Sequence, residues 1–189
     1  MDVTKSDLLQ QVREIYAKHL QMPYISPERD LQAWLNEVSV SSGKIVPKRN
    51  MERLDNGLLP GHIILLWRVN FGTYTTDTVI SKYFEHTYGI DAQKDIHLLM
   101  EQGLVEEESA IVSTRHLTSG VLKSFLKEKQ VKGLSSLKRA DIDEAIRTHF
   151  SEEELTKLFA LRGYTLTQKG QETLKCYPEV VDRHPKKKF

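Results

Sequence analysis

The residue types that most often carry catalysis occur in this sequence without the spacing that catalysis needs. The Ser-x-x-Lys pattern of some acylating enzymes occurs at Ser41, Ser124 and Ser135, and three occurrences in a chain rich in serine and lysine show how unspecific it is. The sequence has no glycine-rich phosphate loop, nucleophile elbow or His-Glu-x-x-His motif. Its acidic residues form runs that are typical of solvated faces. We therefore expect no catalytic residue, no small-molecule substrate and no cofactor.

Metal and redox chemistry also lack a local pattern. The seven histidines are dispersed, and no two of them stand three to five residues apart, the spacing of many zinc ligands. The single cysteine, Cys176, excludes an intramolecular disulfide and a cysteine-rich zinc site. Both facts fit a reducing compartment. We expect a cytoplasmic protein without a bound metal.

Length and composition indicate a folded chain that does not enter a membrane. Of the 189 residues, 39% are hydrophobic and 28% are charged, which is enough apolar material for a packed core. The longest uninterrupted apolar run covers residues 63–67, far short of the roughly 20 residues that a membrane span needs. The first residues lack the apolar run of a signal peptide. We expect neither secretion nor membrane insertion.

Charge is distributed unevenly along a chain that is nearly neutral as a whole. Lysine and arginine number 27 against 26 aspartate and glutamate. Residues 91–110 carry one lysine and six acidic residues, whereas residues 117–140 carry six basic residues and one glutamate. A third, basic cluster near the C-terminus sets Lys175, Arg183, Lys186, Lys187 and Lys188 against Glu179 and Asp182.

The basic segment 117–140 also has helix-loop-helix character, which suits contact with phosphates. Basic side chains near a helix N-terminus and an adjoining loop can meet successive phosphates, and backbone amides at that N-terminus add donors. The alternative is an ordinary solvated lysine face. The candidate nucleic-acid-binding residues are six basic residues and two serines that offer hydroxyl or backbone donors: Lys123, Lys127, Lys129, Lys132, Ser135, Ser136, Lys138 and Arg139.

Periodicity and turn residues predict a mainly helical chain with a few short strands. Helices are expected over residues 7–20, 75–87, 138–150 and 152–161, with others that begin near residues 27, 91, 119 and 167. Short strands are expected over residues 44–46, 110–112 and 164–166, the first of them within a long connection over 39–56. Residues 63–67 fit a buried strand or a buried helix, and the wider spacing favours helix. The tail, 182–189, is expected to be mobile.

Two sequence stretches resemble the SAP domain. They are LTSGVLKSFLKEK at residues 117–129 and KRADI at residues 138–142. The SAP domain is a pair of amphipathic helices joined by an extended loop, and in many families it binds A/T-rich duplex DNA. The leucine stripe and the KRADI opening match its pattern over about residues 117–150. The loop departs from it, because Gln130 stands where glycine is usual and Ser136-Leu137 replaces Ser-Gly.

Two looser resemblances extend beyond that segment. Residues 57–63, 82–91 and 164–170 resemble uncharacterised bacterial and bacteriophage proteins that carry a SAP-like segment. Residues 90–105 resemble the end of a winged helix, in which Gln102-Gly103-Leu104-Val105 would enter a wing. The acidic residues there would be repelled by phosphate. This resemblance therefore implies a packing or protein-binding role for the winged-helix-like region.

These observations combine into one expected organisation and two candidate functions. We expect a helical region over 1–56, a winged-helix-like region over 57–116, a SAP-like pair over 117–150 and a C-terminal extension with a basic tail over 151–189. The leading function is non-enzymatic binding of double-stranded DNA through the basic segment. The alternative is a protein-interaction adaptor, which would use the acidic surface around Glu106 to Glu108 or the apolar face near Trp67 and would bind no nucleic acid.

Overall fold

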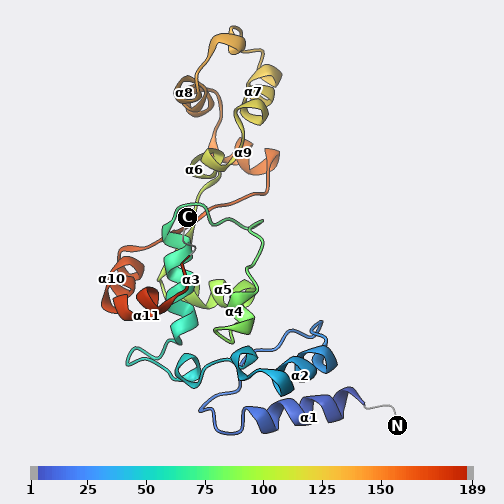
Figure 1. The fold of residues 1–189 in the computed structure, drawn as a ribbon. Coiled ribbons are helices and arrows are strands. Elements are labelled where there is room, and N and C mark those ends of the chain that lie inside the picture. Colours follow the sequence, from blue (N-terminus) through green and yellow to red (C-terminus); the bar gives the residue numbers. More distant parts are fainter. Residues whose placement is uncertain (1–3, 187–189) are drawn as a thin grey trace. The chain divides into compact units, whose positions relative to one another are not determined.

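The computed structural model describes residues 4–186 as a mainly helical protein with one small sheet of two strands (Figure 1). Two compact units divide the chain. Unit 1 comprises residues 1–68, 79–105 and 167–189, and unit 2 comprises residues 69–78 and 106–166. Within the described residues, every helix is too short or too polar to cross a membrane.

Unit 1 contains most of α3, Pro60–Asn70, whose last two residues belong to unit 2. Residues 63–67 are helical, as the wider spacing favoured, and Ile63, Ile64, Leu65 and Leu66 are fully buried. Four consecutive buried positions place protein on every side of this helix. The other elements with residues in unit 1 are α1 (Lys5–Ile15), α2 (Leu31–Val40), η1 (Ser42–Lys44), η2 (Lys48–Met51), α4 (Tyr83–His86), α5 (Ala92–Glu101), α10 (Gln168–Cys176) and α11 (Pro178–Arg183).

Side-chain caps begin α1 and α2, and both helices differ from expectation. Thr4 caps α1 by accepting from the Asp7 amide, and α1 ends at Ile15 rather than near residue 20. Asp30 caps α2 by accepting from the Ala33 amide, so Pro27 lies outside that helix. In both cases an oxygen acceptor that can reach a free amide sets the start.

Three further predictions in unit 1 and its connections were wrong. Residues 44–46 are not a strand: Lys44 is the last residue of η1, and residues 45 and 46 belong to no helix or strand. Of the helix expected over 75–87, only α4 forms, because the backbone before it pairs elsewhere: Thr75 bridges to Gly163 and the Thr76 amide donates to the Arg162 carbonyl. The tail expected to be mobile forms the end of α11 and then buries His184. Lys187, Lys188 and Phe189 of that tail lie outside the described residues.

Unit 2 packs three longer helices around a shared apolar core. Its elements are β1 (Val105–Glu107, whose first residue belongs to unit 1), α6 (Ala110–Ser113), η3 (Thr114–His116), α7 (Ser119–Glu128), η4 (Leu134–Ser136), α8 (Arg139–His149), α9 (Glu152–Leu158) and β2 (Tyr164–Leu166). The buried core residues are Ala110, Leu122, Leu126, Ile142, Ile146, Phe150 and Leu155. The expected strand over 164–166 is β2, and its partner is β1.

The segment over 110–112 is helical rather than a strand, and a distant carboxylate explains why. Glu152 accepts hydrogen bonds from the amides of Ala110 and Ile111, at 2.5 and 2.9 Å. The Ser109 hydroxyl accepts from the Val112 amide at 3.3 Å. Three amides of the first turn therefore have acceptors, which stabilises the start of α6. The contribution of Glu152 cannot be deduced from local sequence.

A buried ion cluster joins separate segments of unit 2. The Glu108 side chain is 5% exposed and forms an ion pair with Arg115, whose own side chain is 43% exposed. Nε2 of His116 lies 3.1 Å from Oε2 of Glu108. Arg115 also donates from Nη1 to the Gly72 carbonyl at 2.7 Å. Glu108 was expected on a solvated acidic face, and its burial corrects that interpretation. Removing one partner from a buried ion pair costs about 3–5 kcal/mol.

Gly163 lies against this cluster and leaves no room for a side chain. A Cβ atom built there would meet the carboxylate of Glu108 and the ring of His116 closer than real Cβ atoms approach. The backbone is bonded on both sides as well: the Glu108 amide donates to the Gly163 carbonyl at 2.8 Å, and the Gly163 amide donates to Ser113 Oγ at 3.0 Å. The segment cannot shift without losing these bonds.

We expect Gly163→Ala to lower the free energy of unfolding by about 3–5 kcal/mol, because the methyl group must displace the buried ion cluster. The matched control is Gly120→Ala in α7, where the nearest atom to an added Cβ lies 3.9 Å away. That change should stabilise the protein by about 0.5–1 kcal/mol. Urea unfolding of both variants measures the difference, and equal effects would contradict the close packing at Gly163.

Candidate nucleic-acid interface

Side-chain contacts join the corresponding ends of α7 and α8. Arg139, the first residue of α8, donates to the carbonyls of Leu117 and Thr114, which precede α7, at 2.8 and 3.0 Å. At the other end, the Lys129 ammonium that follows α7 lies 5.0 Å from the centre of the Phe150 ring, just after α8. The connection from 129 to 138, which contains η4, leads from the end of α7 to the start of α8 (Figure 1).

The apolar faces of the two helices pack as their spacing predicted. Leu122, Ile142 and Ile146 are at most 1% exposed. Phe125 is half-buried and packs against the same core, with its ring stacked on Phe159 at a centroid distance of 6.1 Å. The framework that carries the basic residues is thus held by apolar contacts, which leave the lysines free to face solvent.

Helix α7 ends in a Schellman motif centred on Gln130. The Gln130 amide donates to the Lys127 carbonyl at 2.9 Å, and the Val131 amide donates to the Leu126 carbonyl at 3.1 Å. Gln130 has a φ of 58°, and it is the sole non-glycine residue with positive φ in the described range. Glycine favours this conformation. The SAP-like pattern has glycine at this position, and the chain keeps the left-handed turn with glutamine.

The six basic candidates divide into four free lysines and two residues with internal partners. Lys127, Lys132 and Lys138 are exposed and Lys123 is half-buried, and none of the four side chains forms an ion pair with another described residue. Lys123 and Lys127 stand four residues apart, so they share one side of α7. We call these four residues the free lysines.

Arg139 and Lys129 hold the helical pair together. Besides its two bonds to carbonyls, Arg139 donates from Nε to Asp143 Oδ1 at 2.8 Å, so all three guanidinium nitrogens have partners in the protein. Lys129 is ion-paired with Glu154, and its hydrogen bond holds the pKa of the Glu154 carboxyl below its usual value. That pair therefore stays charged at neutral pH. Neither residue offers an unengaged cation to a phosphate.

The two candidate serines lie in the connection between the helices. Ser135 and Ser136 are both exposed within η4. The Ser136 hydroxyl donates to the Gly133 carbonyl at 3.0 Å, and Gly133 has a φ of 76°. The tight turn at Gly133 thus engages one serine, while the Ser135 side chain has no hydrogen bond to another described residue.

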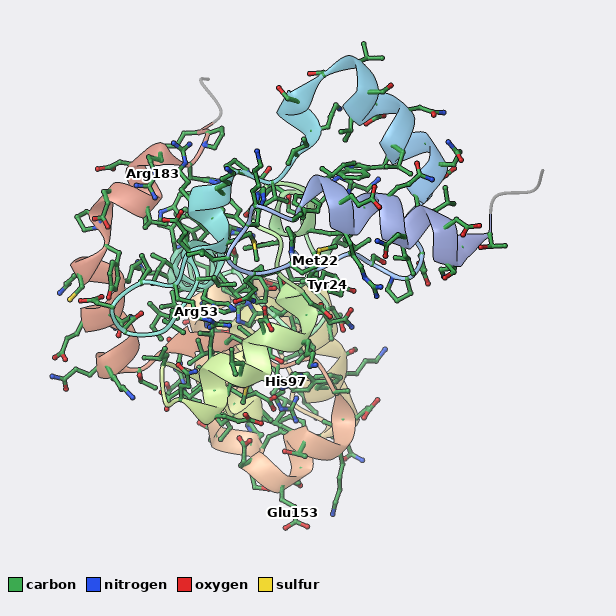
Figure 2. All side chains as sticks on the ribbon, turned by 90° about the horizontal axis from the view of Figure 1, so that it is seen from below. Met22, Tyr24, Arg53, His97, Glu153 and Arg183 are labelled. Carbon is green, nitrogen blue, oxygen red and sulfur yellow. The ribbon has the colours of Figure 1, made fainter. Side chains whose placement is uncertain are left out.

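Acidic residues limit where a polyanion could lie. On α8, Asp141 and Glu144 are exposed and Asp143 is half-buried and paired with Arg139. On α9, Glu153 extends into solvent (Figure 2). Residues 117–150 carry seven lysine and arginine residues against four acidic ones. A polyanion would be attracted to the free lysines on α7 and the connection, and repelled from the acidic side of α8 and α9.

The two surfaces considered for the adaptor alternative are smaller than the sequence suggested. Burial of Glu108 leaves Glu106 and Glu107 as the exposed part of the triple glutamate. Trp67 is half-buried, and its ring meets the His184 ring at a centroid distance of 5.2 Å.

Among residues 4–186, no group of three histidine, cysteine, aspartate or glutamate side chains is placed to hold a metal ion.

Comparison with protein-family models, with curated proteins and with solved structures finds no match to this chain.

We expect Arg139→Gln to lower the free energy of unfolding by about 2 kcal/mol, because charged hydrogen bonds to two carbonyls and one carboxylate are lost. The neighbouring change Lys138→Gln should alter it by no more than about 0.5 kcal/mol, since the Lys138 side chain has no ionic partner among the described residues. Urea unfolding distinguishes the two. A similar loss in both variants would contradict the structural role of Arg139.

We expect Gln130→Gly to raise the free energy of unfolding by about 0.5–1 kcal/mol. The left-handed conformation costs a non-glycine residue about 1–2 kcal/mol, and the greater chain entropy of glycine offsets part of the gain. Lys132→Gly, in the same connection but without positive φ, should instead destabilise the protein. Thermal unfolding of the two variants tests this, and a loss of stability in both would count against strain at Gln130.

Proposed function

We propose that the protein binds the phosphates of double-stranded DNA through the free lysines and takes no part in catalysis. The observation that carries the proposal is that some basic residues of the segment have partners within the protein and others do not. Arg139 and Lys129 fix the helical pair, while Lys123, Lys127, Lys132 and Lys138 remain without internal ionic partners among the described residues. Unpaired basic side chains on a fixed scaffold are the means by which proteins neutralise phosphates.

The spacing of the free lysines supports contact with successive phosphates. Lys123 and Lys127 lie about one helical turn apart, roughly 6 Å along the axis, and Lys132 and Lys138 continue the basic run along the connection. Nucleotides follow one another every 3.4 Å or so along one strand of a duplex. Two lysines on adjacent turns can therefore meet phosphates one or two nucleotides apart.

The chemistry of these residues favours binding without sequence preference. Lysine presents a flexible point charge, whereas base readout relies on bidentate side chains such as arginine, asparagine and glutamine. The resemblance of residues 117–150 to SAP domains supports the binding of duplex DNA. A cytoplasmic location belongs to this proposal, since the exposed thiol of Cys176 suits a reducing compartment.

Salt dependence of duplex binding tests the proposal. With three or four phosphates neutralised, log affinity should fall with log salt at a slope of about −2.7 to −3.6. Replacing any one free lysine by glutamine should flatten the slope by about 0.9 and weaken binding to unrelated sequences alike. Fluorescence anisotropy with a labelled duplex, between about 50 and 200 mM salt, measures both quantities.

The matched control is Lys157→Gln on α9. Lys157 is exposed but paired with Glu153, and acidic residues surround it. This variant should keep the affinity and the slope of the unmodified protein. If the unmodified protein shows no duplex binding at low salt, the DNA proposal fails and the adaptor function becomes the better interpretation.

A further inference from the structure

The C-terminal basic cluster, which the proposed DNA interface does not use, meets a second arginine within unit 1. Arg183 lies on α11 (Figure 2) and lines a cavity of about 90 Å³ together with Arg49 of η2. More than 130 residues separate the two arginines in the chain. The remaining residues that line the cavity are Pro47, Asn50, Thr87, Tyr88, Val180 and Pro185.

Two arginines line the cavity, and no acidic residue of the described range 4–186 lines it. Neither Arg49 nor Arg183 forms an ion pair or a side-chain hydrogen bond with another residue in the described part of the chain. Burial and the neighbouring Tyr83 raise the pKa of Tyr88 to about 12. The positive charges of Arg183 and Arg49 act to lower this pKa, so both guanidinium groups interact electrostatically with the Tyr88 hydroxyl. Two like charges beside one cavity repel each other unless an anion lies between them.

Hydrogen bonds hold two polar residues in a wall that also contains Pro47, Val180 and Pro185. Asn50 is 5% exposed and donates from Nδ2 to the Thr87 carbonyl at 2.8 Å. Tyr88 is 4% exposed, and its hydroxyl oxygen lies 2.7 Å from Nδ1 of His184, which is also buried. These bonds fix the wall before any ligand arrives, so the cavity does not need to be ordered on binding.

The size of the cavity selects a small ligand. Sites for drug-sized molecules have volumes of roughly 300–1,000 Å³. At about 90 Å³ this cavity is far smaller, which favours a small group such as one tetrahedral oxyanion. The planar, forked guanidinium group is the side chain best suited to paired phosphate oxygens.

We propose that Arg49 and Arg183 form a binding site for one phosphate-sized oxyanion. Free phosphate and a backbone phosphate of a nucleic acid present the same oxygens, and the experiment below separates these two sources. The site is independent of the free lysines on residues 123–138, so the two proposals can fail separately.

The test is a titration of the full-length protein with inorganic phosphate, at constant ionic strength set with chloride. Two-dimensional NMR follows the side-chain Nε–H signals of Arg49 and Arg183, which should shift and saturate with phosphate. Arg49→Gln and Arg183→Gln should each weaken binding about ten- to hundredfold, because charged hydrogen bonds are lost. Arg49→Lys and Arg183→Lys keep the charge and lose the fork, so they should also weaken binding.

The matched control is Arg53→Gln, since Arg53 donates to the Gly57 carbonyl and lies outside this cavity. It should leave phosphate binding unchanged. A short DNA duplex forms the second arm: shifts of the two arginine signals with duplex but not with phosphate would support the site and assign the anion to a nucleic-acid backbone. Two results with phosphate count against the site: arginine signals that shift without saturating, and a loss of affinity in Arg53→Gln equal to that in the other variants. Either of them, if the arginine signals also fail to respond to duplex, would overturn the proposal.

Discussion

The carboxylate of Glu108 is the charge on which the closure of unit 2 depends. It is buried and ion-paired with Arg115, it contacts the ring of His116, and Gly163 packs directly against it. Through Arg115 it also reaches the Gly72 carbonyl, so one anion connects three segments of the chain that are far apart in sequence. A buried carboxylate without these partners would be strongly destabilising. The need to neutralise it therefore fixes the positions of residues 72, 108–116 and 163 relative to one another.

The same principle, a charged group bonded to distant backbone, governs the helical pair. Glu152 supplies acceptors for the first turn of α6, and Arg139 supplies donors to the carbonyls that precede α7. The N-terminal ends of α7 and α8 are thus fastened to the segment that contains the Glu108 cluster. Basic side chains in this region therefore have two roles. Arg139 and Lys129 bond to the protein itself, and the free lysines remain available to a polyanion.

Local signals in the sequence were sufficient wherever a cap, a stripe or a turn decided the structure. Thr118 and Thr167 cap their helices, Gly89 has positive φ, and the stripe of Leu122, Ile142 and Ile146 is buried. Prediction failed where a residue far along the chain supplied the missing bond. Local spacing cannot show that Glu152 caps α6 or that the Arg162 carbonyl accepts from the Thr76 amide, and it placed Glu108 in solvent.

Prediction of the candidate interface was limited in the same way. Counting charges found all six basic residues but could not separate Arg139 and Lys129 from the free lysines. The cavity between Arg49 and Arg183 left no signal in local sequence at all.

The order in which the residues of the two units are synthesised has a consequence for folding on the ribosome. Unit 2 consists of residues 69–78 and 106–166, whereas unit 1 needs residues 167–186 in addition to its two earlier segments. Residue 166 leaves the ribosome before α10 and α11 do, so unit 2 is complete first even though unit 1 begins first. Until then α3 lacks the contact between the rings of Trp67 and His184, whose centroids lie 5.2 Å apart. After unit 2 is complete, the nascent chain therefore still exposes part of its most apolar helix, a state in which chaperone binding or aggregation competes with folding.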